Sequence, residues 1–182
     1  MVPAKQCEKS TAAASVAGQS PRGQTRHAPD PRQLTNDDRG RVLTHLLRLG
    51  AQDRQMRFCQ SFSDANVTHY VAGMDFERSV CFGVIDENQD LIALVQTFAY
   101  DDGGVRMLEA AFSTDAPARR QGLGTLLFHQ VTDYAVAQCI DRVIAQCLAG
   151  NRPMRALLRA IGAVCDMDDG EVTGRLEVAG RA

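Results

Sequence analysis

A glycine turn between a strand-like run and a helix-like run constrains the fold of this chain more than any other feature. The turn is Arg119-Arg120-Gln121-Gly122-Leu123-Gly124-Thr125, and it follows the apolar run at 105–114. Two glycines within three residues let the backbone bend tightly, and a first helical turn offers unpaired N–H groups with a partial positive charge. Such a turn binds anions, above all phosphate groups.

Two well-known phosphate-binding motifs do not fit this turn. A Walker loop needs a Lys and then a Ser or Thr after its last glycine, whereas Gly124 is followed by Thr125 and Leu126. A dinucleotide-binding turn needs Gly or Ala where Leu127 stands, and it normally lies early in the chain. What remains is Arg-x-x-Gly-x-Gly between a strand and a helix.

The residues after the turn predict a parallel crossover unit. Leu123, Leu127, Val131 and Ala135 recur at the spacing of an amphipathic helix that packs on a sheet. The β-rich run 142–148 follows. A strand, a helix and a strand in succession predict that strands 105–114 and 142–148 are parallel, with a right-handed connection.

The rest of the chain reads as further strands and helices. Turn residues and helix-start signals predict a short strand near Leu34, a helix from 35 to 50, a helix at 63–73, strands at 79–85 and 91–95, a helix at 151–162 and a last hairpin over 163–178. The stretch 53–58 reads as a charged connector with one anchoring aromatic residue.

Composition separates a tail from one domain. Residues 1–33 lack Leu, Ile, Phe, Trp and Tyr, so a disordered tail is expected there and a folded domain over 34–180. The formal net charge of -2 gives no reason to expect nucleic-acid binding. No apolar run has the length of a membrane span and no secretory signal is readable, so we expect a cytoplasmic protein without membrane contact. The six cysteines form no Cys-x-x-Cys pair, and no metal site is expected.

The motifs together resemble the GCN5-related N-acetyltransferase (GNAT) family. Its central motif is Gln/Arg-x-x-Gly-x-Gly/Ala, and its Asn-x-x-Met-x-x-Leu segment is similar to Asn151-x-x-Met154-x-x-Leu157. Two further pieces, Asp53-Arg54-x-x-Arg57-Phe58 and Asp75-Phe76-Glu77-Arg78, resemble the acetyltransferase domains of bacterial acyl-CoA synthetase-like protein-lysine acetyltransferases. The resemblance implies a mixed α/β sheet of about six to seven strands flanked by about four helices.

The resemblance also implies acetyl-CoA as co-substrate and a role for each residue around the turn. Main-chain N–H groups would bind the diphosphate from Gln121, Gly122, Leu123, Gly124 and Thr125. The guanidinium of Arg119 or Arg120 would place a positive charge nearby. The main chain of Phe112 and Thr114 would pair with the pantetheine arm and polarise the thioester carbonyl. Asn151 would contact the pantetheine arm, and it is an equally good helix cap.

Acetyl transfer to an amine needs a base, because a lysine ammonium with a pKa near 10.4 cannot attack. The candidate is Glu109, since its apolar neighbours predict a sheltered position and the resembling domains have a Glu at the equivalent place. The alternative is a solvent-facing or ion-paired strand residue. The proton donor stays unassigned, because Leu158 stands where many family members carry a Tyr; Tyr134 is expected in the core, and Cys147 is a donor only if its thiol is not buried.

Three functions follow from these residues. The first is an N-acetyltransferase that moves acetyl from acetyl-CoA to a primary amine, on a protein lysine or a small molecule, as a monomer or homodimer. The second is a non-catalytic acyl-CoA-binding regulatory module, suggested by the missing Tyr. The third is a nucleotide-phosphate binder unrelated to coenzyme A.

Overall fold

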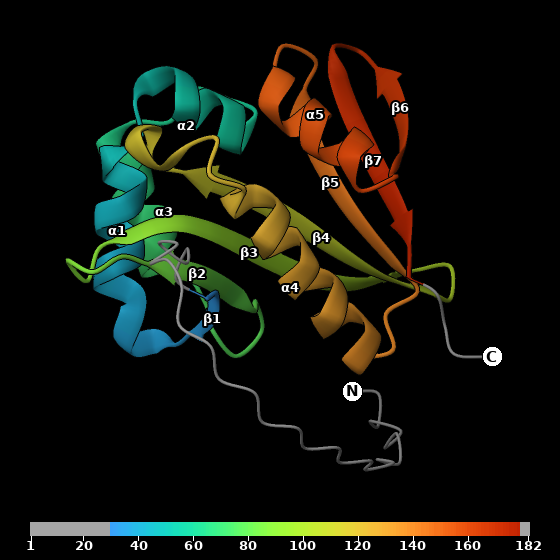
Figure 1. Ribbon diagram of the computed structural model, residues 1–182, viewed down its shortest axis with the longest axis horizontal. Helices are drawn as coiled ribbons and strands as arrows, with labels where there is room; N and C mark the ends of the chain where they lie inside the picture. Colours follow the sequence, from blue (N-terminus) through green and yellow to red (C-terminus); the bar gives the residue numbers. More distant parts are fainter. Residues whose placement is uncertain (1–29, 179–182) are drawn as a thin grey trace, which may run out of the picture.

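A seven-stranded mixed sheet runs through the protein, which a computed structural model describes over residues 30–178 (Figure 1). The strands are β1 (Arg32–Leu34), β2 (Cys81–Ile85), β3 (Leu91–Asp102), β4 (Val105–Thr114), β5 (Arg142–Leu148), β6 (Val164–Asp168) and β7 (Glu171–Glu177). Their order in space is β1-β2-β3-β4-β5-β7-β6, and only β4 and β5 pair in parallel. Residues 1–29 of the tail expected at 1–33 lie outside the described residues.

Helices cover both faces of this sheet. They are α1 (Arg39–Arg48), α2 (Ala51–Phe58), α3 (Asp64–Ala72), α4 (Leu123–Ala137) and α5 (Arg152–Ala160). α4 lies across β2 to β5 and buries Leu127 and Val131 against Val95 and Leu108. α1 and α3 pack on the opposite face, and α5 covers β5 and β7 through the buried Leu158.

Much of the predicted order is confirmed. β4 and β5 have the predicted bounds, they are parallel, and α4 connects them. Ser63 caps α3 by accepting a hydrogen bond from the Asn66 N–H (3.2 Å), and the last two strands form the predicted hairpin. The mixed α/β sheet implied by the family resemblance is also present, with seven strands.

Two predictions were wrong. Residues 53–58 are not a connector, because they lie in α2, and the flanking helices therefore number five among the described residues. β3 does not end at Val95 but continues to Asp102, because its second half pairs with β4 along the whole hairpin.

The two halves of the sheet diverge beside β4. β4 and β5 pair only at Met107↔Arg142, Leu108↔Val143 and Glu109↔Ile144. Beyond these three pairs β4 stays with β3 as far as Thr114, while β5 stays with β7 as far as Leu148. The second half of β4 and the second half of β5 therefore each have a main-chain edge that pairs with no other described strand.

Candidate active site

The glycine turn lies between β4 and α4 and has the backbone shape that the sequence predicts. Gly122 precedes the helix with a φ of 79°, and Arg120 also has a positive φ, of 60°. The N–H of Leu126 donates to the Gly122 carbonyl (3.0 Å), so the N–H groups of Leu123, Gly124 and Thr125 precede the first bond of the helix. These three donors and the helix dipole are available to an anion.

The two glycines of the turn serve different purposes. Gly122 has open space around it and is needed for its left-handed conformation. Gly124 has an ordinary conformation, but a Cβ atom there would lie 3.4 Å from Leu157 Cδ2 of α5. Gly122 therefore sets the direction of the turn, whereas a Cβ atom at position 124 would make an ordinary van der Waals contact with α5.

Arg119 is held between two elements. Its Nη2 lies 2.7 Å from Asp53 Oδ2 of α2, and its Nε donates to the Thr114 carbonyl at 3.4 Å. Arg120 and Gln121 are exposed, and Gln121 Nε2 donates to the Pro117 carbonyl at 3.3 Å. Of the two arginines that precede the turn, Arg119 is thus the one positioned by its neighbours.

The hydrogen-bond pattern of β4 shows which main-chain groups face the divergence from β5. The Asp115 N–H donates to the Ile92 carbonyl (2.9 Å), so the odd-numbered residues of β4 direct their N–H groups toward β3. The N–H groups of Phe112 and Thr114 consequently point toward β5 beyond the last pair, Glu109↔Ile144, where no described strand pairs with them. The Phe112 ring stacks on Phe128 of α4, with centroids 5.7 Å apart, which fixes this segment on the α4 side.

Glu109 lies on the opposite face of β4, at the last residue pair before the divergence. It is half-buried rather than fully buried, and no Arg, Lys or His of residues 30–178 forms an ion pair with it. Phe98 of β3 is its cross-strand partner. A carboxylate that is not tied up in an ion pair is free to accept a proton from a substrate.

Two neighbours of Glu109 were not identified from the sequence. Burial raises the pKa of the Tyr100 hydroxyl, and the nearby carboxylates of Glu109 and Asp102 add to that rise. Burial also raises the pKa of the Cys59 thiol, with further contributions from Glu171 and Glu109. Cys59 ends α2, so the helix that was not predicted brings this thiol, together with Arg57, within electrostatic range of the candidate base. The position of Cys59 relative to Glu109 follows only from the tertiary contact of α2 with β4 and β5.

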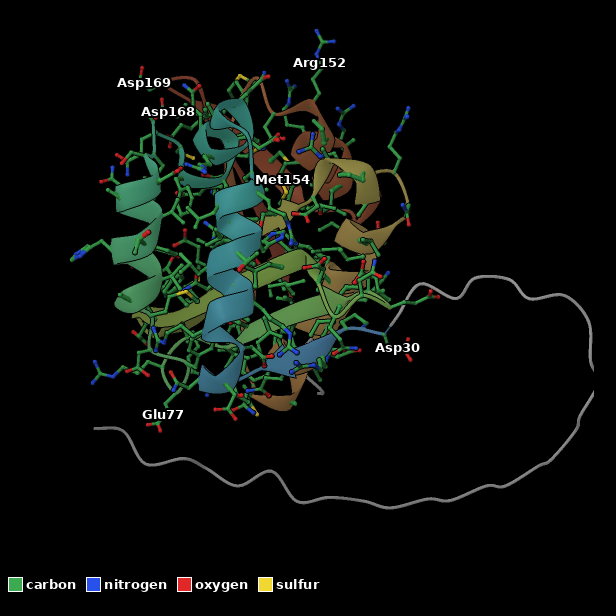
Figure 2. The ribbon with its side chains drawn as sticks, turned by 90° about the vertical axis from the view of Figure 1, so that its left-hand side faces the viewer. Asp30, Glu77, Arg152, Met154, Asp168 and Asp169 are labelled. Carbon is green, nitrogen blue, oxygen red and sulfur yellow. The ribbon has the colours of Figure 1, made fainter. Side chains whose placement is uncertain are left out.

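Asn151 follows β5 and caps α5. Its Oδ1 accepts a hydrogen bond from the Met154 N–H (3.1 Å), and its own N–H donates to the Leu148 carbonyl (2.8 Å). Figure 2 shows α2, Arg152 at the start of α5, and Asp168 and Asp169 at the tip of the β6–β7 hairpin at one end of the molecule. Asn151 and the motif residues of α2 thus lie toward the same end of the molecule, whereas the segment 75–78 lies at the other end, where Figure 2 labels Glu77.

Comparison with known proteins agrees with this arrangement. The model of a GNAT acetyltransferase domain matches residues 32–164. The chain belongs to the GNAT acetyltransferase family. Members of this family use acetyl-CoA as the acetyl donor, and the GNAT fold accounts for the mixed sheet and its divergent strands.

Solved GNAT structures resemble the chain in fold, at low sequence identity. The GNAT domain of S. lividans PAT has a TM-score of 0.69 at 21% identity, over 81% of this chain and 89% of that one. The ribosomal-protein-S18-alanine N-acetyltransferase from Escherichia coli has a TM-score of 0.64 at 16% identity, over 84% and 95% of the two chains. Arabidopsis thaliana NAA60, solved with acetyl-CoA, has a TM-score of 0.60 at 14% identity, over 81% and 97%.

The sequence offered Tyr134 and Cys147 as proton donors, with Leu158 in place of the family's Tyr, and the structure puts both candidates in poor positions. Leu158 is 1% exposed and packs directly on Gly174, where an added Cβ would lie 2.5 Å from Leu158 Cδ2. Tyr134 packs edge-on against Phe82 in the core, and burial raises its pKa. Burial raises the pKa of the Cys147 thiol to about 11, which makes it a poor nucleophile.

Other kinds of site have no counterpart in the part of the GNAT domain that the structure describes. No three His, Cys, Asp or Glu side chains of residues 30–178 come together in a way that would hold a metal ion. None of the helices over the same residues is both long and apolar enough to cross a bilayer.

Proposed function

We propose that this GNAT domain transfers the acetyl group of acetyl-CoA to a primary amine, with Glu109 as general base. The observation that carries the proposal is the place of Glu109, at the last paired residue of β4 before the strands diverge and in no ion pair with a described residue. The amine nitrogen attacks the thioester carbonyl carbon, and its proton passes to the Glu109 carboxylate directly or through water.

The residues present fit an acyl-CoA molecule. The N–H groups of Leu123, Gly124 and Thr125 suit its diphosphate, and the guanidinium of Arg119 lies at the start of the same turn. The outward N–H groups of Phe112 and Thr114 suit the amide carbonyls of a pantetheine arm. The departing thiolate is a good leaving group, so we assign its proton to water rather than to a side chain.

A Glu109→Gln variant tests the base. The amide keeps the shape of the side chain but accepts no proton, so kcat with an amine acceptor should fall by about 10²- to 10⁴-fold. The dissociation constant for acetyl-CoA should not change, because Glu109 lies on the face of β4 opposite Phe112. Release of free coenzyme A thiol measures the first quantity, and calorimetry measures the second.

The matched control is Glu87→Gln, in the exposed turn between β2 and β3. It should leave both quantities unchanged. Full turnover by Glu109→Gln at neutral pH would exclude Glu109 as the base.

The second candidate function is an acyl-CoA-binding regulatory module without turnover, and the observation that favours it is the buried Leu158 at the position of the family's Tyr. This function predicts binding of acetyl-CoA with no acetylated product from any amine. Detection of product with the wild-type protein would exclude it.

A further inference from the structure

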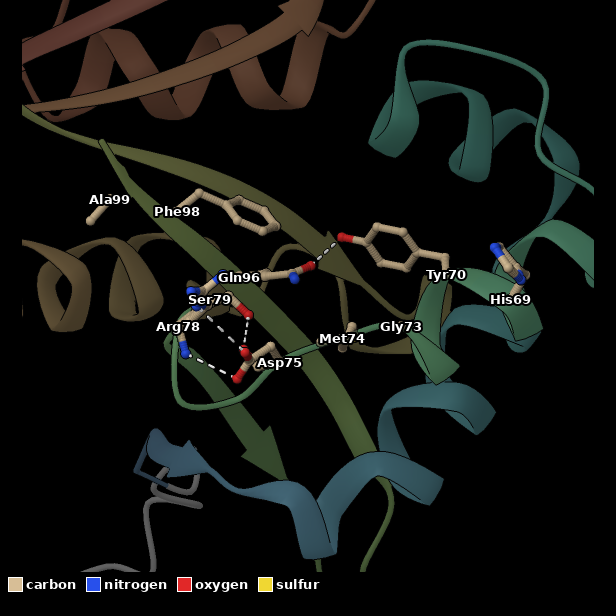
Figure 3. Close-up of a pocket in the computed structure, with 10 residues that line it drawn as sticks. All are labelled: His69, Tyr70, Gly73, Met74, Asp75, Arg78, Ser79, Gln96, Phe98 and Ala99. Atoms are coloured by element: carbon tan, nitrogen blue, oxygen red, sulfur yellow. Dashed lines mark hydrogen bonds and ion pairs between the residues drawn. The ribbon is translucent and has the colours of Figure 1, made fainter. Parts of the chain in front are cut away.

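Two groups of polar side chains are buried on the sheet face that carries Glu109. The first surrounds Gln96, which lines a hollow of about 470 Å³ beside α3 and accepts hydrogen bonds from Tyr70 and from Arg57 (3.2 Å) (Figure 3). These bonds fasten α3 and α2 to the sheet. The second group surrounds His45 of α1, which is 0% exposed and contacts the end of β4.

Each ring nitrogen of His45 has a polar neighbour. Nδ1 lies 3.0 Å from the Leu91 carbonyl oxygen and 2.8 Å from Asp115 Oδ1. Nε2 lies 2.8 Å from Ser113 Oγ. Because a carbonyl and a carboxylate only accept hydrogen bonds, Nδ1 carries a hydrogen atom, and in the neutral ring Nε2 accepts the hydroxyl hydrogen of Ser113. His45 therefore joins α1 to the start of β3 and to two residues at the end of β4.

Arg48, one turn further along α1, holds Asp115 from a second side. Its Nε donates to Asp115 Oδ2 at 3.0 Å, and its Nη1 donates to Asp90 at 2.9 Å. Burial raises the pKa of the Asp115 carboxyl, but the hydrogen bonds and charges of His45 and Arg48 outweigh burial and lower it. Asp115 is therefore ionised at neutral pH. We call His45, Arg48, Ser113 and Asp115 the His45 network.

Ser113 connects the His45 network to the free main-chain donors of β4. It lies between Phe112 and Thr114, whose N–H groups point toward the divergence from β5. This part of β4 pairs with a strand on one edge only, so contacts on its two faces have to hold it. The Phe112 ring stacks on α4 on one face, and the contact of Ser113 with His45 is the counterpart on the other face.

Asp115 connects the same network to the glycine turn. Its carbonyl accepts a hydrogen bond from the Ala118 N–H (2.9 Å), within a short 3-10 helix at Ala116–Ala118, and Arg119 of the turn follows directly. A shift of Asp115 would therefore move the start of the turn. Donors that are held in place before a ligand arrives bind it more tightly, because less freedom is lost on binding.

We propose that His45 is a positioning residue for acetyl-CoA, because it fixes Ser113 and Asp115 and so sets the donors of β4 and of the glycine turn in the places that the ligand needs. The inference rests on the proposed function, since it takes acetyl-CoA to bind along β4 and the turn. His45 is fully buried and acts through these two residues rather than on the ligand.

A double-mutant cycle, with the dissociation constant for acetyl-CoA measured by calorimetry, tests the proposal. Ser113→Ala removes the partner of Nε2 and should raise the constant about three- to tenfold, as for the loss of one hydrogen bond. His45→Leu removes every polar contact of the ring and should raise it about 10- to 100-fold. In the His45→Leu background, Ser113→Ala should have no further effect, because its partner is already gone.

A conservative variant and a control separate positioning from stability. His45→Gln supplies an amide oxygen that can accept the Ser113 hydroxyl hydrogen, so it should recover part of the affinity that His45→Leu loses. The matched control is Val42→Ala, one turn earlier on α1 and also 0% exposed, which removes apolar packing from the same helix. It should lower Tm and leave the dissociation constant of the folded protein unchanged.

The outcomes distinguish this inference from the proposed function. If the wild type binds acetyl-CoA and turns over an amine, but Ser113→Ala and His45→Leu bind acetyl-CoA as tightly, the role of His45 is overturned and the proposed function stands. Additive effects of the two substitutions would also overturn it, as would an equal loss of affinity in Val42→Ala. Should His45→Leu fail to fold, Ser113→Ala alone decides the question. Absence of acetyl-CoA binding by the wild type would overturn both.

Discussion

Asp38 shows at the scale of one residue how the first strand is attached to the helices. Its buried carboxylate accepts hydrogen bonds from the Arg32 guanidinium (2.6 and 2.9 Å), from Arg41 (3.0 Å) and from the Thr35 N–H (3.1 Å). The hydrogen bond from Arg32 outweighs the effect of burial and lowers the pKa of Asp38 to about 2. β1 and α1 are therefore linked by a group that contributes only while it is ionised.

Replacement of Asp38 by Asn should destabilise the protein in a pH-dependent way. A pKa lowered from 3.8 to about 2 corresponds to about 2 kcal/mol of folding free energy at neutral pH. Because the folded-state pKa is lowered, this contribution is complete above pH 4 and is lost as the pH falls toward 2. Urea unfolding of both proteins at pH 7 and at pH 3 measures how the difference between their free energies of unfolding changes with pH.

The control for this prediction is Asp37→Asn, next to it and exposed. It should change the unfolding free energy by at most about 0.5 kcal/mol. If the free energies of unfolding of Asp38→Asn and wild type differ as much at pH 2.5 as at pH 7, the ionised form of Asp38 is not what stabilises the fold.

A single residue also shows where the sequence was informative and where it was not. Glu109 could be proposed because it lies in a motif-bearing strand whose bounds are marked by turn residues on both sides. Tyr100 and Cys59 could not be proposed as its neighbours from the sequence. The β3–β4 pairing brings Tyr100 to this part of the sheet, and the packing of α2 brings Cys59 there. Contacts between distant segments leave no local pattern in the sequence.

α2 is the element that the sequence analysis missed, and its composition explains why. Its eight residues include only Ala51, Met56 and Phe58 as apolar members, and Gly50 before it provides no side-chain cap. Such a segment shows no apolar stripe and reads as a polar loop. Tertiary contacts hold it instead, above all those of Arg54, which is 8% exposed.

Arg54→Ala should therefore detach α2. Arg54 donates to the Leu47 carbonyl (2.7 Å) and the Phe62 carbonyl (3.4 Å) and pairs with Asp64. Loss of these bonds leaves partly buried acceptors unsatisfied, at a cost of about 2 kcal/mol. Hydrogen exchange should become faster in residues 51–58 and stay unchanged in α4.

Acetyl-CoA binding should weaken in the same variant, because the partner of Arg119, Asp53, lies on α2. The control is Arg78→Ala, whose side chain is 89% exposed and which should alter neither exchange nor acetyl-CoA binding. Unchanged exchange in residues 51–58 of Arg54→Ala would show that other contacts suffice to hold the helix.

At the scale of the whole molecule, the sheet consists of two halves joined at few points. β1 to β4 form one half and β5, β7 and β6 the other, and three residue pairs connect β4 with β5. α4 bridges the halves on one face, through Leu127 and Val131 and the buried Val143 of β5. A ligand bound between the unpaired edges of β4 and β5 would contact both halves of the sheet. Its binding should therefore increase the stability of the folded protein.

Acetyl-CoA should accordingly stabilise the protein and protect particular amides. At a free concentration 100 times its dissociation constant, a ligand bound only to the folded state adds about 2.7 kcal/mol. For a domain of this size that raises Tm by roughly 5–10 °C. Protection from hydrogen exchange should appear at Phe112, Thr114 and Leu123 to Thr125, whose N–H groups have no strand or helix partner, and not at 164–168 in β6. A rise in Tm with protection confined to β6 and β7 would mean that acetyl-CoA binds elsewhere, because the free donors at the divergence of β4 and β5 would then have gained no partner.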